Sequence, residues 1–282
     1  MKITFKNDNR IFTLFCLLNK LGYDSENNRQ GMHPIRRRIR AELNIANDLF
    51  LQLKPFFNSY HQSEFIKAFL HFSSFPKFRL QEKKWQSRVP KAKFLKYLPL
   101  IKLFYKAGEI NQLFAINNHY YQKHIKSYSH KIAEDLNELS RFFKIKTPIV
   151  NIILAPNFLD AYWRGYGPMF KNKQYIVYGP CDNLKKYKFL IRHEFLHGLI
   201  NPLRDKKIKK LFQSILPLIK INKQTPKFYP AKKIMAWEYL IRAFNILYLT
   251  KNSKKDLPNL LNKERRKGFK LIEKVIEQIK MP

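Results

Sequence analysis

Residues 191 to 202 read IRHEFLHGLINP, and His193, Glu194 and His197 within them form an HExxH pattern. Four residues advance an α-helix by 400°, so His193 and His197 project from one face about 40° apart and about 6 Å apart along the axis. Two imidazoles placed in this way can bind one metal ion. An ordinary buried helix that carries two histidines is the other interpretation, and the surrounding sequence has to distinguish between them.

Most of the surface of this predicted helix is apolar. The apolar side chains are those of Ile191, Phe195, Leu196, Leu199 and Ile200. Glu194, His197 and Asn201 share an arc of about 100° with His193. Burying imidazoles and a carboxylate without partners costs free energy, and a metal ion would supply the partner.

Catalytic zinc takes three protein ligands and leaves one position for water, so a third ligand is needed. Every other histidine, from His33 to His130, lies before the motif, and Leu203 occupies the position at which a metzincin carries its third histidine. The third ligand is therefore expected among the acidic residues after the motif. These include Asp205, Glu238, Glu264, Glu273 and Glu277.

Glu238 is distinctive because it lies in MAWEYLIRAFNILYL, residues 235 to 249, where nearly every other side chain is apolar. On a helical wheel Glu238, Arg242 and Asn245 share a stripe about 60° wide. Such a stripe is either a solvent-facing surface or a metal ligand with Arg242 orienting it from four residues away. The HExxH pattern favours the ligand, and Asp205, close after Pro202, is the alternative.

The composition predicts a mostly helical α+β protein. The chain has 282 residues, 45% of them hydrophobic, and only eight glycines. Residues 11 to 142 are expected to form successive helices. The breaks are expected at Gly22, Pro34, Pro55, Pro76, Pro90, Pro99 and Gly108.

The pattern changes near Pro148. The apolar runs IVNIILAP, residues 149 to 156, and QYIVYGP, residues 174 to 180, predict two strands on either side of a loop. Asp182 is expected to cap a helix from Leu184 to about Asn201. Further helices are expected at 205 to 220, 231 to 250 and 258 to 280. We therefore expect an N-terminal helical region, 1 to 142, and a catalytic domain with a small sheet, 143 to 282.

HExxH combined with a glutamate on a later helix resembles the gluzincin group of zinc metallopeptidases. The stretches HEFLHGLINP, WEYLIRA, VNIILAP and GYGP are more narrowly similar to the bacterial family called domain of unknown function 4932. LLNKLGYDSEN and PFFNSYHQSEFIKAF are looser matches to the same family. The resemblance covers nearly the whole chain and implies a zincin-like fold and peptidase activity, without indicating a substrate.

The resemblance implies one Zn²⁺ per chain, held by His193, His197 and Glu238, with Glu194 as the general base. Arg242 and Asn201 are expected to support the ligands, and the substrate is expected to be a peptide or protein. Tyr229, Tyr178 and Tyr166 are unranked candidates for stabilising the oxyanion. The QYIVY strand is a candidate edge for pairing with an extended substrate.

The formal net charge of +35 is compatible with a second class of function, a protein that binds nucleic acid or an anionic surface and keeps a structural or relict metal site. A hydrolase of a non-peptide bond is a third. The basic residues are spread along the whole chain, so we expect no specific nucleic-acid partner. The apolar run RIFTLFCLL, residues 10 to 18, has no cleavage site after it, and we expect a cytoplasmic protein without a transmembrane segment.

Overall fold

The computed structural model describes residues 1–23, 31–43, 45, 47–73, 75, 77–81, 84–143, 151–202, 206–220 and 231–280. The chain forms two compact units. The first comprises Met1–Ala133 and Val150–Leu190, and the second comprises Glu134–Ile149 and Ile191–Pro282. Both units are discontinuous in sequence, which differs from the single division at residue 142 expected from the sequence. The strands after residue 150 belong with the N-terminal helices because they pair with a strand at Lys2–Phe5.

The first unit contains a mixed five-stranded sheet. Its strands are β1 (Lys2–Phe5), β2 (Asn151–Pro156), β3 (Gly165–Tyr166), β4 (Met169–Phe170) and β5 (Lys173–Tyr178). β2 runs parallel to both β1 and β5, and the register places Ile152 opposite Ile3 and Gln174. The two predicted strands are confirmed, whereas β1 was not expected from the sequence.

The predicted edge position of the QYIVY strand is wrong. β5 has β2 on one side and the short antiparallel strands β3 and β4 on the other. Between those two strands, the amide of Tyr175 donates a hydrogen bond to the carbonyl of Pro168 at 3.0 Å. The segment expected to be a loop therefore covers β5, and β5 has no free edge for a substrate strand.

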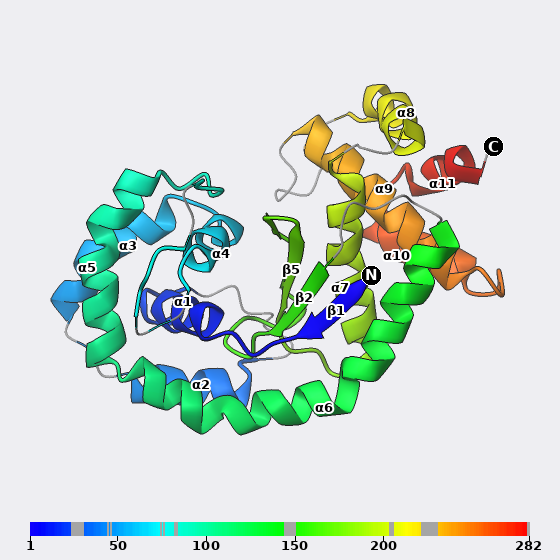
Figure 1. The fold of residues 1–282 in the computed structure, drawn as a ribbon. Coiled ribbons are helices and arrows are strands. Elements are labelled where there is room, and N and C mark those ends of the chain that lie inside the picture. The colour runs from blue at the N-terminus through cyan, green and yellow to red at the C-terminus, as the bar shows by residue number, and fades with distance from the viewer. Residues whose placement is uncertain are drawn as a thin grey trace. The chain divides into compact units, whose positions relative to one another are not determined.

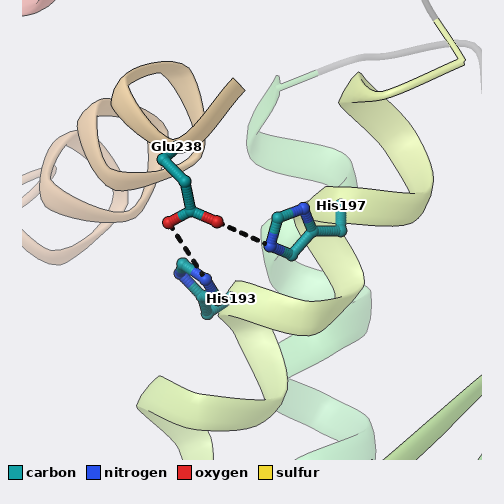
Figure 2. Close-up of side chains that lie close together, drawn as sticks. All are labelled: His193, His197 and Glu238. Atoms are coloured by element: carbon teal, nitrogen blue, oxygen red, sulfur yellow. Dashed lines mark ion pairs between the residues drawn. The ribbon is translucent and has the colours of Figure 1, made fainter. Parts of the chain in front are cut away.

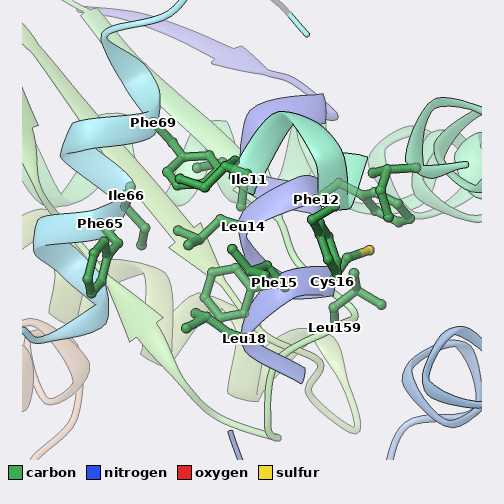
Figure 3. Packing of buried hydrophobic residues seen from close by; sticks show 14 of the residues in the cluster. Ile11, Phe12, Leu14, Phe15, Cys16, Leu18, Phe65, Ile66, Phe69 and Leu159 are labelled. Carbon is green, nitrogen blue, oxygen red and sulfur yellow. The ribbon is translucent and has the colours of Figure 1, made fainter. Parts of the chain in front are cut away.

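The first unit also contains helices, most of which are drawn to one side of the sheet in Figure 1. They are α1 (Asn9–Lys20), α2 (Pro34–Glu42), α3 (Asn47–Asn58), α4 (Gln62–Leu70), α5 (Lys91–Ala107) and the first part of α6 (Ile110–Phe143). α1 packs against α4 through side chains that recur every three or four residues and point toward one another in Figure 3. Those labelled include Ile11, Leu14, Phe15 and Leu18 of α1 and Phe65, Ile66 and Phe69 of α4. All seven are buried, and each contributes about 1.5–3 kcal/mol through removal of apolar surface from water.

Two of the predicted helix breaks are wrong, since Pro55 lies inside α3 and Pro99 lies inside α5. An interior proline costs a helix about 3 kcal/mol, because it removes a hydrogen bond and crowds the preceding turn. Both helices carry fully buried aromatic side chains near the proline, among them Phe56 in α3 and Phe104 in α5. Packing of these side chains outweighs the local cost of the proline.

All the regular secondary structure among the described residues of the second unit is helical. Besides the end of α6 it contains α7 (Leu184–Ile200) from Ile191 onward, α8 (Lys206–Ile215), η1 (Leu216–Leu218), α9 (Lys232–Leu249), α10 (Leu257–Arg266) and α11 (Ile272–Lys280). α9 packs against α8, α10 and α11. The helix predicted over 258 to 280 is two helices, because Gly268 adopts a φ of +96° between them.

The mostly helical α+β fold predicted from the sequence is confirmed. Across the described residues, no helix combines the length and the apolar character needed to span a bilayer.

Candidate metal centre

His193 and His197 lie on successive turns of α7, and their ring centroids are 4.9 Å apart. The helix begins after Asn183, whose side-chain oxygen accepts a hydrogen bond from the amide of Lys186 at 3.1 Å. Asn183 is thus the capping residue in place of the predicted Asp182, which instead pairs with the Lys186 ammonium group. The i, i+4 spacing on this helix produces the paired imidazoles expected from the sequence.

Glu238, on α9, faces both imidazoles (Figure 2). Its Oε1 lies 3.1 Å from Nε2 of His197, and its Oε2 lies 3.6 Å from Nε2 of His193. One ligand atom from each of the three residues lies within 4.8 Å of the others. Tetrahedral zinc, with ligand bonds of about 2.0–2.2 Å, separates its donor atoms by about 3.3–3.6 Å. The three residues can therefore hold a metal ion, and they are the single such group among the described residues.

The Glu238 carboxylate is buried, with 4% of the residue exposed. Its Oε2 accepts no hydrogen bond from any described residue, because the contacts with His193 and with Arg242, at 3.3 Å, lack the geometry of one. Burial acts to raise the pKa of Glu238, but the imidazoles outweigh burial and lower it well below 4.5. A buried, ionised oxygen without a hydrogen bond is costly unless a cation is nearby, which agrees with a metal ligand.

Arg242 lies one turn beyond Glu238 on α9, as the predicted polar stripe requires. One guanidinium nitrogen approaches Glu238 Oε2, and another donates to Oε2 of Glu264 on α10 at 2.6 Å. Lys267 pairs with the other oxygen of Glu264 at 2.6 Å. Burial acts to raise the pKa of Glu264, yet Arg242 and Lys267 outweigh it and lower the pKa. From the sequence Glu264 was only one of the acidic residues after the motif, and its contact with Arg242 was not predicted.

Asn201, which follows α7, contacts the far side of the His197 ring, with its Nδ2 3.1 Å from Nδ1. Its own Oδ1 is buried and receives no hydrogen bond from the described residues. A half-turn of the amide brings Oδ1 to Nδ1, where it can accept the Nδ1 proton. His197 would then present the lone pair of Nε2 toward Glu238, which is the tautomer that binds a metal through Nε2.

Glu194 is 8% exposed and follows His193 directly on α7. Burial raises the pKa of this carboxyl, the two imidazoles partly offset that effect, and Glu238 adds to it. Glu194 therefore interacts electrostatically with all three candidate ligands. A carboxyl with a raised pKa next to a metal centre is suited to accepting and returning a proton near neutral pH.

Four further residues were candidates for the site from the sequence. Asp205 and Tyr229 are outside the described residues. Tyr178 and Tyr166 belong to the first unit, where the Tyr178 hydroxyl lies 3.3 Å from His124 Nε2 and the Tyr166 hydroxyl lies 3.0 Å from that of Tyr23. Burial raises the pKa of both phenols well above 10.

No protein-family model, curated protein or solved structure matches this chain. The residues of the metal centre and their geometry are therefore the basis for proposing a function.

Proposed function

We propose that this protein is a zinc-dependent metallopeptidase of the gluzincin type, as the resemblance to domain of unknown function 4932 implies. The observation that carries the proposal is the convergence of His193, His197 and Glu238 from two helices, beside the buried carboxyl of Glu194. His197 and Glu238 are about 40 residues apart in sequence, so HExxH alone does not dictate this convergence. An ordinary buried helix would not require a distant acid aimed at both imidazoles.

Two imidazoles and one carboxylate are a ligand set of catalytic zinc, with a fourth position left for water. One ion per chain is expected. Bound there, zinc would lower the pKa of a bound water toward neutrality and polarise the carbonyl of the scissile peptide bond.

The chain itself supplies the proton transfers and the order of the site. Glu194 accepts a proton from the attacking water and returns it to the nitrogen of the leaving amine, so its raised pKa matches both steps. Asn201 fixes the His197 ring from behind, and Arg242 restrains the Glu238 carboxylate. These contacts hold the ligands in place without touching the substrate.

The test is metal content together with peptide cleavage. The protein is stripped with a chelator, reloaded with one equivalent of zinc and incubated with a peptide library analysed by mass spectrometry. We expect one zinc per chain and cleavage only after reloading. Failure to bind zinc would contradict the proposal. One bound zinc without peptide cleavage would also contradict it and would leave the two alternatives, a polyanion-binding protein with a structural metal and a hydrolase of a non-peptide bond.

A further inference from the structure

We propose that Glu264 is a positioning residue for the metal centre: it holds Arg242 and offsets its charge, so that Glu238 remains available to the metal. The inference rests on the metal site of the proposed function. Glu264 does not contact the imidazoles and would act only through Arg242.

The contacts form a chain of alternating charges that leads away from Glu238. Arg242 lies 3.3 Å from Glu238 and 2.6 Å from Glu264, and Lys267 lies 2.6 Å from Glu264. The shorter and better aligned contact of Arg242 is with Glu264, since only that one is a hydrogen bond. The guanidinium is therefore anchored on α10 and touches Glu238 more weakly.

The turn at the end of α10 forms a binding surface for the Arg242 side chain. Gly268, with a φ of +96°, ends the helix. The amide of Phe269 donates a hydrogen bond to the carbonyl of Glu264 at 3.1 Å, and the amide of Gly268 donates one to the carbonyl of Arg265 at 3.0 Å. These paired bonds define a Schellman motif, in which the residues equivalent to Glu264 and Phe269 are brought together. The Phe269 ring centre lies 4.1 Å from the guanidinium carbon, so one turn supplies both a carboxylate and an aromatic face.

The positive charge of Arg242 explains why its contact with Glu264 should affect metal binding. A free guanidinium beside Glu238 would compete with the metal for the carboxylate and would repel a divalent cation in the same buried region. Glu264 is also the one acid in the segment KERRK, residues 263 to 267. Its carboxylate is the partner that offsets Arg242, and replacing it leaves four basic residues and no acid within that segment.

The experiment measures zinc affinity by competition with a chromophoric chelator, for the full chain and for Glu264→Gln. We expect zinc binding to weaken by about 10- to 100-fold, the range typical of residues that support metal ligands. Visible spectra of the cobalt-loaded proteins should also differ, because the Glu238 ligand would be held differently. Glu273→Gln is the matched control: it breaks an exposed ion pair with Arg265 between α10 and α11, and its zinc affinity should equal that of the parent.

A double-mutant cycle with Arg242→Met separates this role from a general loss of stability. If Glu264 acts through Arg242, replacing Glu264 in the Arg242→Met background should change zinc affinity less than about threefold. That comparison remains decisive if the single variant folds poorly, since replacing both members of a buried ion pair is far less disruptive than replacing one.

The outcomes differ for the two proposals. If the parent binds zinc and Glu264→Gln binds it equally well, or if the two substitutions are additive, Glu264 has no positioning role and the proposed function stands. If the parent binds no zinc, the proposed function fails, and this inference fails with it.

Discussion

Glu194 and His197 are neighbours on α7, yet substituting them should have opposite consequences for the metal. Glu194 follows the first imidazole and has a pKa raised by burial, which suits proton transfer. His197 directs Nε2 toward the Glu238 carboxylate, which suits ligation. Metal binding and proton transfer are therefore assigned to side chains that can be replaced separately.

Glu194→Gln keeps the volume of the side chain and a hydrogen-bonding group but removes the base. Zinc should remain bound at one per chain, and hydrolysis should fall by about 10² to 10⁴, the usual contribution of general acid and base catalysis. Zinc content and the cleavage rate of a library-derived peptide are the measurements. His197→Ala is the contrasting control and should empty the site. A Glu194→Gln protein that cleaves as fast as the parent would exclude this HExxH as a peptidase site.

The sequence was most informative about the individual side chains of the metal centre. The spacing of His193 and His197 needs only a helix to become a pair of ligands, so HExxH predicted their geometry directly. Glu238 was identified because a carboxylate stands out on an apolar helix. Glu264 could not be found in the same way, because its role depends on a tertiary contact between α9 and α10 that no local spacing encodes.

At the scale of elements, the turn after α10 connects helix termination to the metal centre. Gly268→Ala puts a Cβ atom at a φ of +96°, which costs about 1–2 kcal/mol in the folded state because the side chain crowds the backbone. Urea denaturation of the zinc-free protein should show this loss of unfolding free energy. Gly268→Asn should lose less, since asparagine tolerates positive φ better than alanine. Equal stability of the alanine variant and the parent would contradict the role of this turn.

The start of α1 provides a second prediction, which concerns pH. Asp8 caps the helix, and its carboxylate pairs with Arg10 at 2.5 Å, while Arg10 also donates to the carbonyls of Leu70 and Phe72 at the end of α4. Both charged residues are buried. Burial acts to raise the pKa of Asp8, but Arg10 outweighs it and holds the pKa below 3.8.

The pKa of Asp8 is lower in the folded than in the unfolded protein. The Asp8–Arg10 pair therefore stabilises the fold at pH values above the ordinary pKa of Asp8, and this contribution is lost as the pH falls through the pKa of the folded protein. Asp8→Asn keeps the cap but leaves Arg10 buried without its counter-charge, which should cost about 3–5 kcal/mol at pH 7. Thermal denaturation from pH 7 to pH 2 measures this difference. The gap between variant and parent should narrow below about pH 4, and a gap independent of pH would rule out the ion pair as its cause.

Some helices and strands were predicted wrongly from local sequence patterns. The helix breaks predicted at Pro55 and Pro99 are wrong, because packing of neighbouring aromatic side chains stabilises each helix by more than the lost hydrogen bond destabilises it. β1 was not predicted, because a strand of four residues is too short for its alternation of apolar and polar side chains to be recognised. Its formation also depends on pairing with β2, about 150 residues away. Long strong patterns, such as those of α7 and α9, were predicted nearly to their ends.

For the whole molecule, the charge of +35 predicts binding to polyanions that depends on salt rather than on sequence. DNA and RNA duplexes of unrelated sequence should bind with similar affinity at low ionic strength, and binding should weaken steeply between 50 and 200 mM salt as counterions are released, by a factor of about 10³ or more. Fluorescence anisotropy titrations at several salt concentrations test this. Tight binding to one sequence that persists at high salt would instead indicate a dedicated nucleic-acid site.

The parallel pairing of β1 with β2 sets the order in which this chain can fold on the ribosome. Phe5 is opposite Leu154, so the first strand has no partner in the sheet until almost 150 further residues have been made. At about 5–20 residues per second, synthesis of that length takes roughly 7–30 s. During that interval α1 and α4 can already meet through their apolar faces, while β1 remains an unpaired strand that a chaperone or a second nascent chain could capture. Pairing of β1 with β2 should therefore follow the contact of α1 with α4, and codon changes between β1 and β2 should alter the yield of folded protein without altering its final stability.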